Sequence, residues 1–133
     1  MKKVCVVCGQ FKEHKAKGKC EQCYSWGKNR KYYSSPTNVK KHKQYYIDLR
    51  FKVLSHYSGG KPICSCCGEE TIEFLSIDHI NGIKNPTEPG RGKMLISWLK
   101  KYKFPSGYRV LCYNCNLSIG FNGYCPHKEV LKR

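Results

Sequence analysis

The sequence predicts a small α+β fold that is stabilised by metal ions. Three observations predict it: the chain has 133 residues, ten of them are cysteine, and eight of these cysteines form C-x2-C pairs. A chain of this length supports one modest domain with small appendages rather than two full hydrophobic cores. We therefore expect zinc ions, held by cysteine sulfurs, to stabilise the fold together with a small apolar core.

The chain is strongly basic, with 25 Lys and Arg against 9 Asp and Glu, which gives a formal net charge of +16. Two four-thiolate zinc sites would each carry a charge of −2 and so leave about +12. A surplus of this size attracts polyphosphates by counterion release. Nucleic acid is the expected partner, and the alternatives are a merely soluble basic surface or a ribosome-associated protein.

Membrane insertion and export are not expected. No apolar run approaches the ~20 residues that a membrane-spanning helix needs, and the apolar stretch after Met1-Lys2-Lys3 is too short for a signal peptide. We therefore predict a cytoplasmic protein without a membrane partner, possibly acting in an infected host cell. In that compartment cysteines are more typical of metal ligands or free thiols than of disulfides.

The first cysteine set predicts a zinc knuckle over residues 1–26. Its ligands follow a C-x2-C-x11-C-x2-C pattern: Cys5, Cys8, Cys20 and Cys23. Each C-x2-C pair lets two sulfurs from one tight turn reach the same tetrahedral ion, and Gly9 supplies a permissive backbone after the first pair. The intervening segment is too polar to form a core, so we expect this region to fold only with zinc. The alternative is a redox pair or free cysteines.

A basic linker and an amphipathic helix are expected next. Residues 27–37 are rich in Lys, Arg, Ser and Tyr and are interpreted as the linker. Residues 38–58 have apolar side chains at helical spacing, namely Tyr46, Leu49, Val53 and Tyr57. The basic start of the helix could lie along a phosphate backbone or simply form a solvated face; its candidate contacts are Lys40, Lys41 and Lys43.

A second metal-binding domain is predicted over residues 59–127, followed by a basic tail over 128–133. Its zinc ligands are Cys64, Cys67, Cys112 and Cys115. Between the two pairs we expect a strand over 71–77 that ends at Asp78-His79, a long loop over 81–92, a short helix over 94–102 and a strand over 108–111. One or two helical turns over 114–119 should follow.

The second zinc would draw an acid, an imidazole and an amide together. Asp78 and His79 follow one strand, and Asn116 opens a helix beside the last zinc ligand. Carboxylate and amide oxygens are ligands that Mg²⁺ or Mn²⁺ prefers. An imidazole titrates near neutral pH and can deprotonate a water molecule. In a basic cleft this set is suited to metal-assisted hydrolysis of a phosphodiester.

Three separated motifs make residues 62–127 resemble zinc-containing HNH endonucleases of the phage or homing type. They are Cys64-x2-Cys67-Gly68, the run Ser76-Ile77-Asp78-His79-Ile80-Asn81-Gly82, and the run Tyr108-Arg109-Val110-Leu111-Cys112-Tyr113-Asn114-Cys115-Asn116. The resemblance implies a ββα-metal finger on the second zinc site, with the N-terminal knuckle and the basic helix before it.

Site roles follow from the resemblance. It implies that His79 is the general base, that Asp78 and Asn116 hold one catalytic Mg²⁺ or Mn²⁺, and that the second cysteine set holds a structural Zn²⁺. With the zinc expected from the spacing of the first set, two structural Zn²⁺ are predicted. The middle asparagine of the family motif falls at Gly107 in this chain. Asn81 or Asn114 could take its place by orienting the histidine.

The expected function is a DNA endonuclease that nicks or cuts double-stranded DNA, as a monomer or a homodimer. Candidate DNA contacts in the second domain are Lys84, Arg91, Lys93, Lys100, Lys101 and Arg109. One alternative is a non-catalytic zinc-ribbon protein that binds nucleic acid, and another is an endonuclease that resolves four-way junctions. Cys66 is expected to be a bystander thiol or to exchange with Cys64, and no role is assigned to Cys125 and His127.

Overall fold

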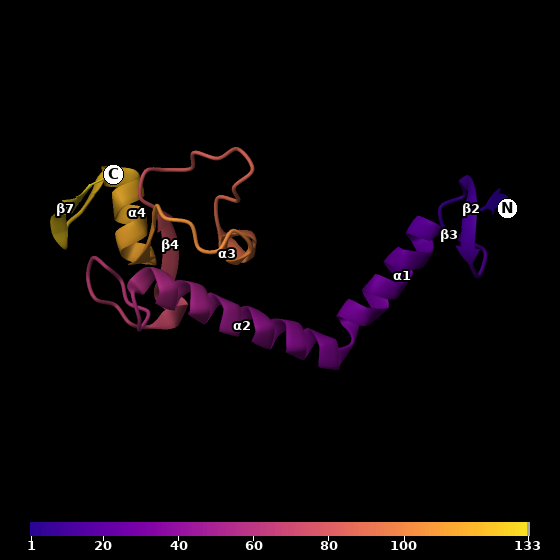
Figure 1. Cartoon of the computed structure of the whole chain (residues 1–133), viewed down its shortest axis with the longest axis horizontal. Coiled ribbons are helices and arrows are strands. Elements are labelled where there is room, and N and C mark those ends of the chain that lie inside the picture. The colour runs from indigo at the N-terminus through magenta and orange to yellow at the C-terminus, as the bar shows by residue number, and fades with distance from the viewer. Residues whose placement is uncertain (133) are drawn as a thin grey trace. The chain divides into compact units, whose positions relative to one another are not determined.

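The computed structural model describes residues 1–132, with side chains through residue 128 (Figure 1). The chain forms two compact units, Met1–Gln44 and Tyr45–Arg133, whose boundary falls inside the long helix α2, Pro36–Ser58. Each unit is described by itself. Among the described residues, no helix has the length and apolar character that crossing a bilayer requires.

The N-terminal unit is a small antiparallel sheet followed by a helix. Its strands, in the order β1-β2-β3, are Lys2–Val4, Phe11–Ala16 and Lys19–Cys20, and α1 spans Glu21–Ser34. Within residues 1–44, all of which the structure describes, the buried side chains are those of Cys5 and Cys20. This unit therefore has no apolar core of its own, as expected for a zinc-dependent fold.

Most of the predicted linker over residues 27–37 is helical, which differs from the sequence-based expectation. Helix α1 continues to Ser34, and α2 begins at Pro36 after the single extended residue Ser35. Lys and Arg favour helices, and one interior glycine, Gly27, costs only about 1 kcal/mol. Proline at the first position of α2 loses no helical hydrogen bond, because that N–H would be unpaired anyway.

The C-terminal unit contains two antiparallel strand pairs and three helices along with the 3-10 turn η1. After α2 the elements are η1 Ile72–Phe74, β4 Leu75–His79, α3 Gly92–Lys101, β5 Tyr108–Cys112, α4 Tyr113–Asn122, β6 Tyr124–Cys125 and β7 Lys128–Lys132. Strand β4 pairs with β5, and β6 pairs with β7. The predicted basic tail over 128–133 is thus a hairpin strand as far as Lys132, and residue 133 lies outside the described residues.

The strand that carries the predicted catalytic residues begins later than expected. A hydrogen bond from the Thr71 N–H to Glu69 Oε1 (2.7 Å) and one from Phe74 N–H to the Thr71 carbonyl (2.9 Å) make residues 71–74 a turn. Strand β4 therefore includes Asp78 and His79 instead of ending before them. The register places Asp78 opposite Arg109 and His79 opposite Tyr108, so β5 can hold both side chains.

Two apolar clusters support this unit. The first joins α2, β4, β5 and α4 and includes Leu54, Leu75, Val110, Leu111 and Ile119. The second joins α2 and α3 through Leu49, Val53, Leu95, Ile96 and Leu99. Arg50 of α2 also donates to the carbonyls of Ile72 (2.8 Å) and Leu75 (2.6 Å). Strand β4 is thus held at its start by Arg50 and along its whole length by pairing with β5.

Candidate functional site

Each predicted cysteine set is assembled with the spacing of a zinc site. Within each group of four, the sulfurs lie within 4.8 Å of one another. The sulfurs of Cys8 and Cys20 are 3.9 Å apart, and those of Cys67 and Cys112 are 3.6 Å apart. A tetrahedral zinc ion with Zn–S bonds of about 2.3 Å requires sulfur separations of about 3.8 Å. Both groups can therefore hold zinc.

The two sites begin with the same backbone turn. The N–H of the first cysteine, Cys5 or Cys64, donates to the carbonyl five residues later (3.0 and 2.8 Å). The glycine after each pair then donates back to that cysteine's carbonyl (2.9 and 3.0 Å). This turn requires a positive φ, which is 68° at Gly9 and 81° at Gly68. The common turn explains the glycine after the first C-x2-C pair of each site.

The second pair of each site lies where a strand passes into a helix. Cys20 precedes α1, and Cys112 precedes α4 with its sulfur accepting from the Cys115 N–H (3.5 Å). In the first site the Cys20 N–H donates to Cys5 Sγ (3.3 Å). That hydrogen bond and one from the Cys8 N–H lower the pKa of the Cys5 thiol to about 5, which favours the thiolate that binds zinc.

A cleft of about 580 Å³ opens beside β4 in the C-terminal unit. Its walls come from α2, β4, the loop before α3, and the start of α4. Asp78, His79 and Asn116, the residues predicted to be catalytic, all line this cleft. The structure thus brings together groups that lie far apart in the sequence, and their catalytic roles stay predictions.

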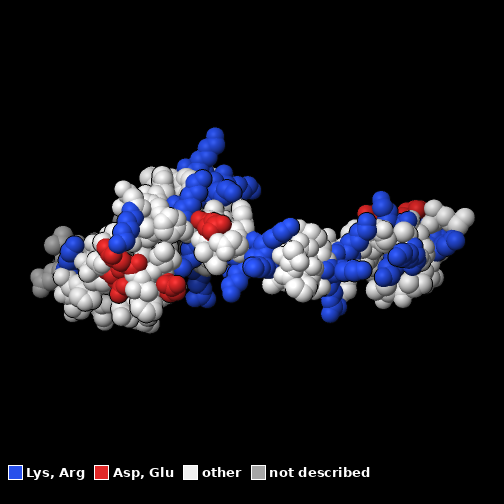
Figure 2. Space-filling view, turned by 90° about the horizontal axis from the view of Figure 1, so that it is seen from below, with Lys and Arg blue, Asp and Glu red and all other residues white. Residues whose placement is uncertain are grey.

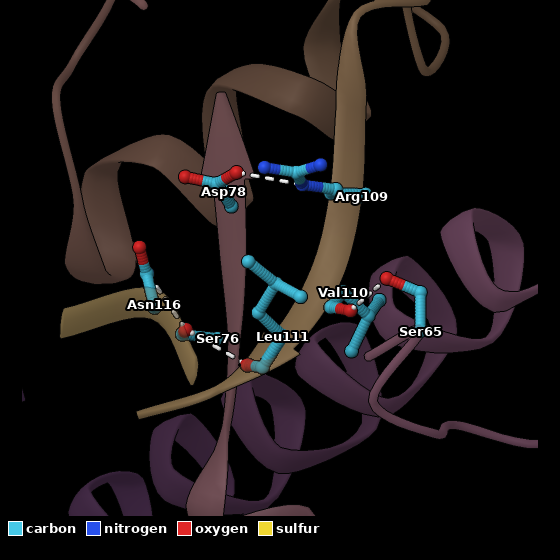
Figure 3. A network of polar contacts seen from close by, with 7 residues as sticks. All are labelled: Ser65, Ser76, Asp78, Arg109, Val110, Leu111 and Asn116. Carbon is cyan, nitrogen blue, oxygen red and sulfur yellow. Dashed lines mark hydrogen bonds and ion pairs between the residues drawn. The ribbon is translucent and has the colours of Figure 1, made fainter. Parts of the chain in front are cut away.

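Asp78 forms an ion pair with Arg109 across the strand pair. Asp78 Oδ2 lies 2.8 Å from Arg109 Nε, and both side chains are largely buried, with 1% and 13% of their surfaces exposed. Figure 3 shows the other carboxylate oxygen of Asp78 turned away from Arg109, toward the side on which Asn116 lies. Arg109 is thus engaged in holding the carboxylate, whereas we predicted it as a DNA contact.

His79 lies against Glu88, an acidic residue for which the sequence predicted no functional role. His79 Nε2 is 2.7 Å from Glu88 Oε1, a close contact without hydrogen-bond geometry, and the Glu88 side chain is only 6% exposed. The Tyr108 hydroxyl donates to the same oxygen. Burial, together with this bond to Glu88, raises the pKa of Tyr108, so the phenol stays a donor. Glu88 and Tyr108 thus occupy the place proposed for Asn81 or Asn114 beside the imidazole.

A hydrogen-bond chain orients Asn116. The Asn116 amide Nδ2 donates to Ser76 Oγ (3.0 Å), which in turn donates to the carbonyl of Leu111 (3.0 Å) (Figure 3). Because the amide nitrogen is engaged by Ser76, the amide oxygen is the atom left to act as a ligand in the cleft. Ser76 is the second residue whose positioning role the sequence did not indicate, although it lies within the Asp-His motif.

Basic side chains surround the cleft. Arg50 and Arg91 line it, and Lys93 lies with its ammonium 4.9 Å from the ring centre of Tyr46. Figure 2 shows Lys and Arg widely spread over each unit, while Asp and Glu form a few small groups. The predicted DNA contacts other than Arg109 are all exposed: Lys40, Lys41, Lys43, Lys84, Arg91, Lys93, Lys100 and Lys101. They are thus available to phosphate groups.

The donor set in the cleft fits a hard divalent cation. Asp78 offers a carboxylate and Asn116 an amide oxygen, and both line the same cavity. Mg²⁺ and Mn²⁺ take such ligands and complete their shells with water and substrate oxygens. The residues that line this cleft include no cysteine, so the two kinds of metal would be sorted by ligand type.

No protein-family model, curated protein or solved structure matches this chain.

Proposed function

We propose that the C-terminal unit is a metal-dependent DNA endonuclease of the HNH type. The observation that carries the proposal is that Asp78, His79 and Asn116 line one cleft in a chain of net charge +16. Their order on a strand pair followed by a helix matches the order that the resemblance to HNH enzymes implies. The zinc group at the base of that helix would then be structural, since four sulfurs leave no open position.

The proposed chemistry is hydrolysis of a phosphodiester. His79 accepts a proton from the attacking water, and the Glu88 carboxylate stabilises the imidazolium that forms. Asp78 and Asn116 would hold a Mg²⁺ or Mn²⁺ ion, which polarises the phosphate and offsets charge on the leaving 3′ oxygen. The water oxygen joins phosphorus as the bond to the 3′ oxygen breaks. The products are a 5′-phosphate and a 3′-hydroxyl.

The basic rim supports a DNA substrate. Arg91 lines the cleft, where its guanidinium can donate two parallel hydrogen bonds to a phosphate. The exposed lysines of α3, namely Lys93, Lys100 and Lys101, add further positive charge to this unit. Contacts of this kind position the sugar-phosphate backbone without reading sequence. These contacts suit a nucleic-acid backbone, and the resemblance to HNH enzymes narrows the proposed substrate class to double-stranded DNA.

Cleavage of supercoiled plasmid tests the proposed function. With Mg²⁺ or Mn²⁺ we expect nicked or linear products whose ends carry 5′-phosphate, and none when the zinc-loaded protein is mixed with DNA in the absence of both ions. Binding without cleavage under every divalent ion would contradict the enzyme and favour the zinc-ribbon alternative. Cleavage of a four-way junction at concentrations that spare linear duplex would instead select junction resolution.

Replacing Glu88 by glutamine is expected to slow cleavage by roughly 10- to 100-fold, because the imidazolium of His79 would lose its charged partner. Single-turnover rates on plasmid DNA measure the effect. Glu70→Gln is the matched control, since Glu70 is exposed and pairs with Lys61 outside the cleft. Equal rates for both variants would show that Glu88 does not assist His79.

A further inference from the structure

A third group of metal-ligand side chains lies beside the second zinc site. Cys66, Cys115, Cys125 and His127 have their ligand atoms within 4.8 Å of one another. The three sulfurs are almost completely buried, with exposures of 3%, 0% and 1%, whereas His127 is exposed. No functional role was predicted from the sequence for three of these residues, namely Cys66, Cys125 and His127. Three thiols and an imidazole gathered at one point are a zinc-binding combination.

The separations within this group match a coordination shell. His127 Nδ1 lies 3.4 Å from Cys115 Sγ and 3.4 Å from Cys125 Sγ. A tetrahedral zinc ion with Zn–S bonds of about 2.3 Å and a Zn–N bond of about 2.0 Å places sulfur and nitrogen about 3.5 Å apart. All the cysteines are free thiols, so disulfide bonding does not account for the cluster.

The group shares one ligand, Cys115, with the second zinc set. A thiolate sulfur has enough lone pairs to bind two metal ions at once. We propose that Cys66, Cys115, Cys125 and His127 hold a further zinc ion, joined to the zinc of Cys64, Cys67 and Cys112 through a bridging Cys115 sulfur. The C-terminal unit then contains a two-zinc cluster with six thiolates and one imidazole.

The net charge favours one zinc ion in each of the two overlapping sets over a single ion that moves between them, because the further ion offsets the charge of the two added thiolates. A single zinc bound by four thiolates has a net charge of −2. Cys66 and Cys125 add two thiolates and the further Zn²⁺ adds two positive charges, so the cluster also has a net charge of −2. Every cysteine in the chain then belongs to a zinc group. No buried thiol would be left without a role.

The proposed ion would fasten the β6–β7 hairpin to the first turn of α4. Cys125 ends β6, His127 lies in the hairpin turn, and Cys115 immediately precedes Asn116. Two contacts already tie the hairpin to the same region: Ser118 Oγ donates to the Tyr124 carbonyl (3.0 Å), and Lys128 Nζ donates to the Ser65 carbonyl (3.3 Å). The metal would thus hold the helix start that carries Asn116.

Zinc stoichiometry of the full chain tests the proposal. Native mass spectrometry and elemental analysis of the untagged, zinc-loaded protein should give three zinc ions per chain. His127→Ala and Cys125→Ser should each give two, while His42→Ala, which changes an exposed histidine of the N-terminal unit, should keep three. Two ions in the unmodified chain, or three in the His127→Ala and Cys125→Ser variants, would overturn the proposal.

A second measurement reports the bridge itself. With ¹¹³Cd in place of zinc, two of the three cadmium resonances should be coupled to each other through the Cys115 sulfur, and His127→Ala should remove one of them. Because His127 is exposed, its replacement should leave the apolar core intact. Three uncoupled resonances would exclude the bridge. Neither measurement depends on DNA cleavage, so the proposed endonuclease and the two-zinc cluster can fail independently.

Discussion

Replacing His79 by alanine is expected to lower the rate of DNA cleavage by about 10²- to 10⁴-fold, the usual contribution of a positioned general base. His79 lines the cleft next to Asp78 and contacts Glu88, so its replacement removes the group that we propose accepts the proton from water. DNA binding should change little, because the exposed basic side chains remain. Single-turnover cleavage and a binding titration with Ca²⁺ measure the two effects separately.

The control variants must distinguish a loss of catalysis from a loss of folding. His79 is only 8% exposed, and its ring packs against that of Tyr108 with ring centres 5.1 Å apart. His79→Gln preserves more of the packed volume and should be as inactive as the alanine variant. His42→Ala, in the N-terminal unit, should cleave like the unmodified chain. Cleavage at the unmodified rate by a folded, zinc-loaded His79→Ala protein would remove the general-base assignment.

The sequence could predict the parts of this structure that depend on local chemistry. The four C-x2-C pairs, with a glycine after the first pair of each group, identified both four-cysteine groups, because such a turn supplies two sulfurs and has a positive φ after them. Helical spacing likewise indicated which face of α2 is apolar, and Leu49 and Val53 are buried. The two cysteines of each pair, and successive apolar positions along α2, lie within a few residues of each other.

The parts that the sequence could not predict depend on where distant segments meet. Glu88 lies in a loop whose Gly and Pro content predicted only the lack of regular structure, yet its carboxylate contacts His79 and Tyr108. Cys66 looked like a bystander because its neighbours Cys125 and His127 come from a hairpin that the sequence did not suggest. One signal was available: the cysteines outnumbered the ligands of two zinc ions.

Replacing Cys112 by serine is expected to unfold β5 and the start of α4 while the packing of α2 on α3 persists. Cys112 joins the end of β5 to the knuckle that holds Cys64 and Cys67, and its sulfur also caps α4. Structural zinc contributes roughly 10–16 kcal/mol in small zinc-binding peptides, as much as the ~5–15 kcal/mol that stabilises a whole domain. Hydrogen exchange resolved by segment should show lost protection over residues 108–122.

The matched variant is Cys5→Ser, which removes a ligand of the other group. Since residues 1–44 bury no apolar side chain besides two cysteines of the first metal-ligand group, this variant should lose all protection in the N-terminal sheet and none in the C-terminal unit. In Cys112→Ser the apolar cluster of Leu49, Val53, Leu95 and Leu99 contains no metal ligand, so it should keep slow exchange. If both variants lost protection along the whole chain, the units would not be independently stabilised. If Cys112→Ser kept protected amides in β5 and α4, apolar packing rather than zinc would hold the frame of the proposed catalytic cleft.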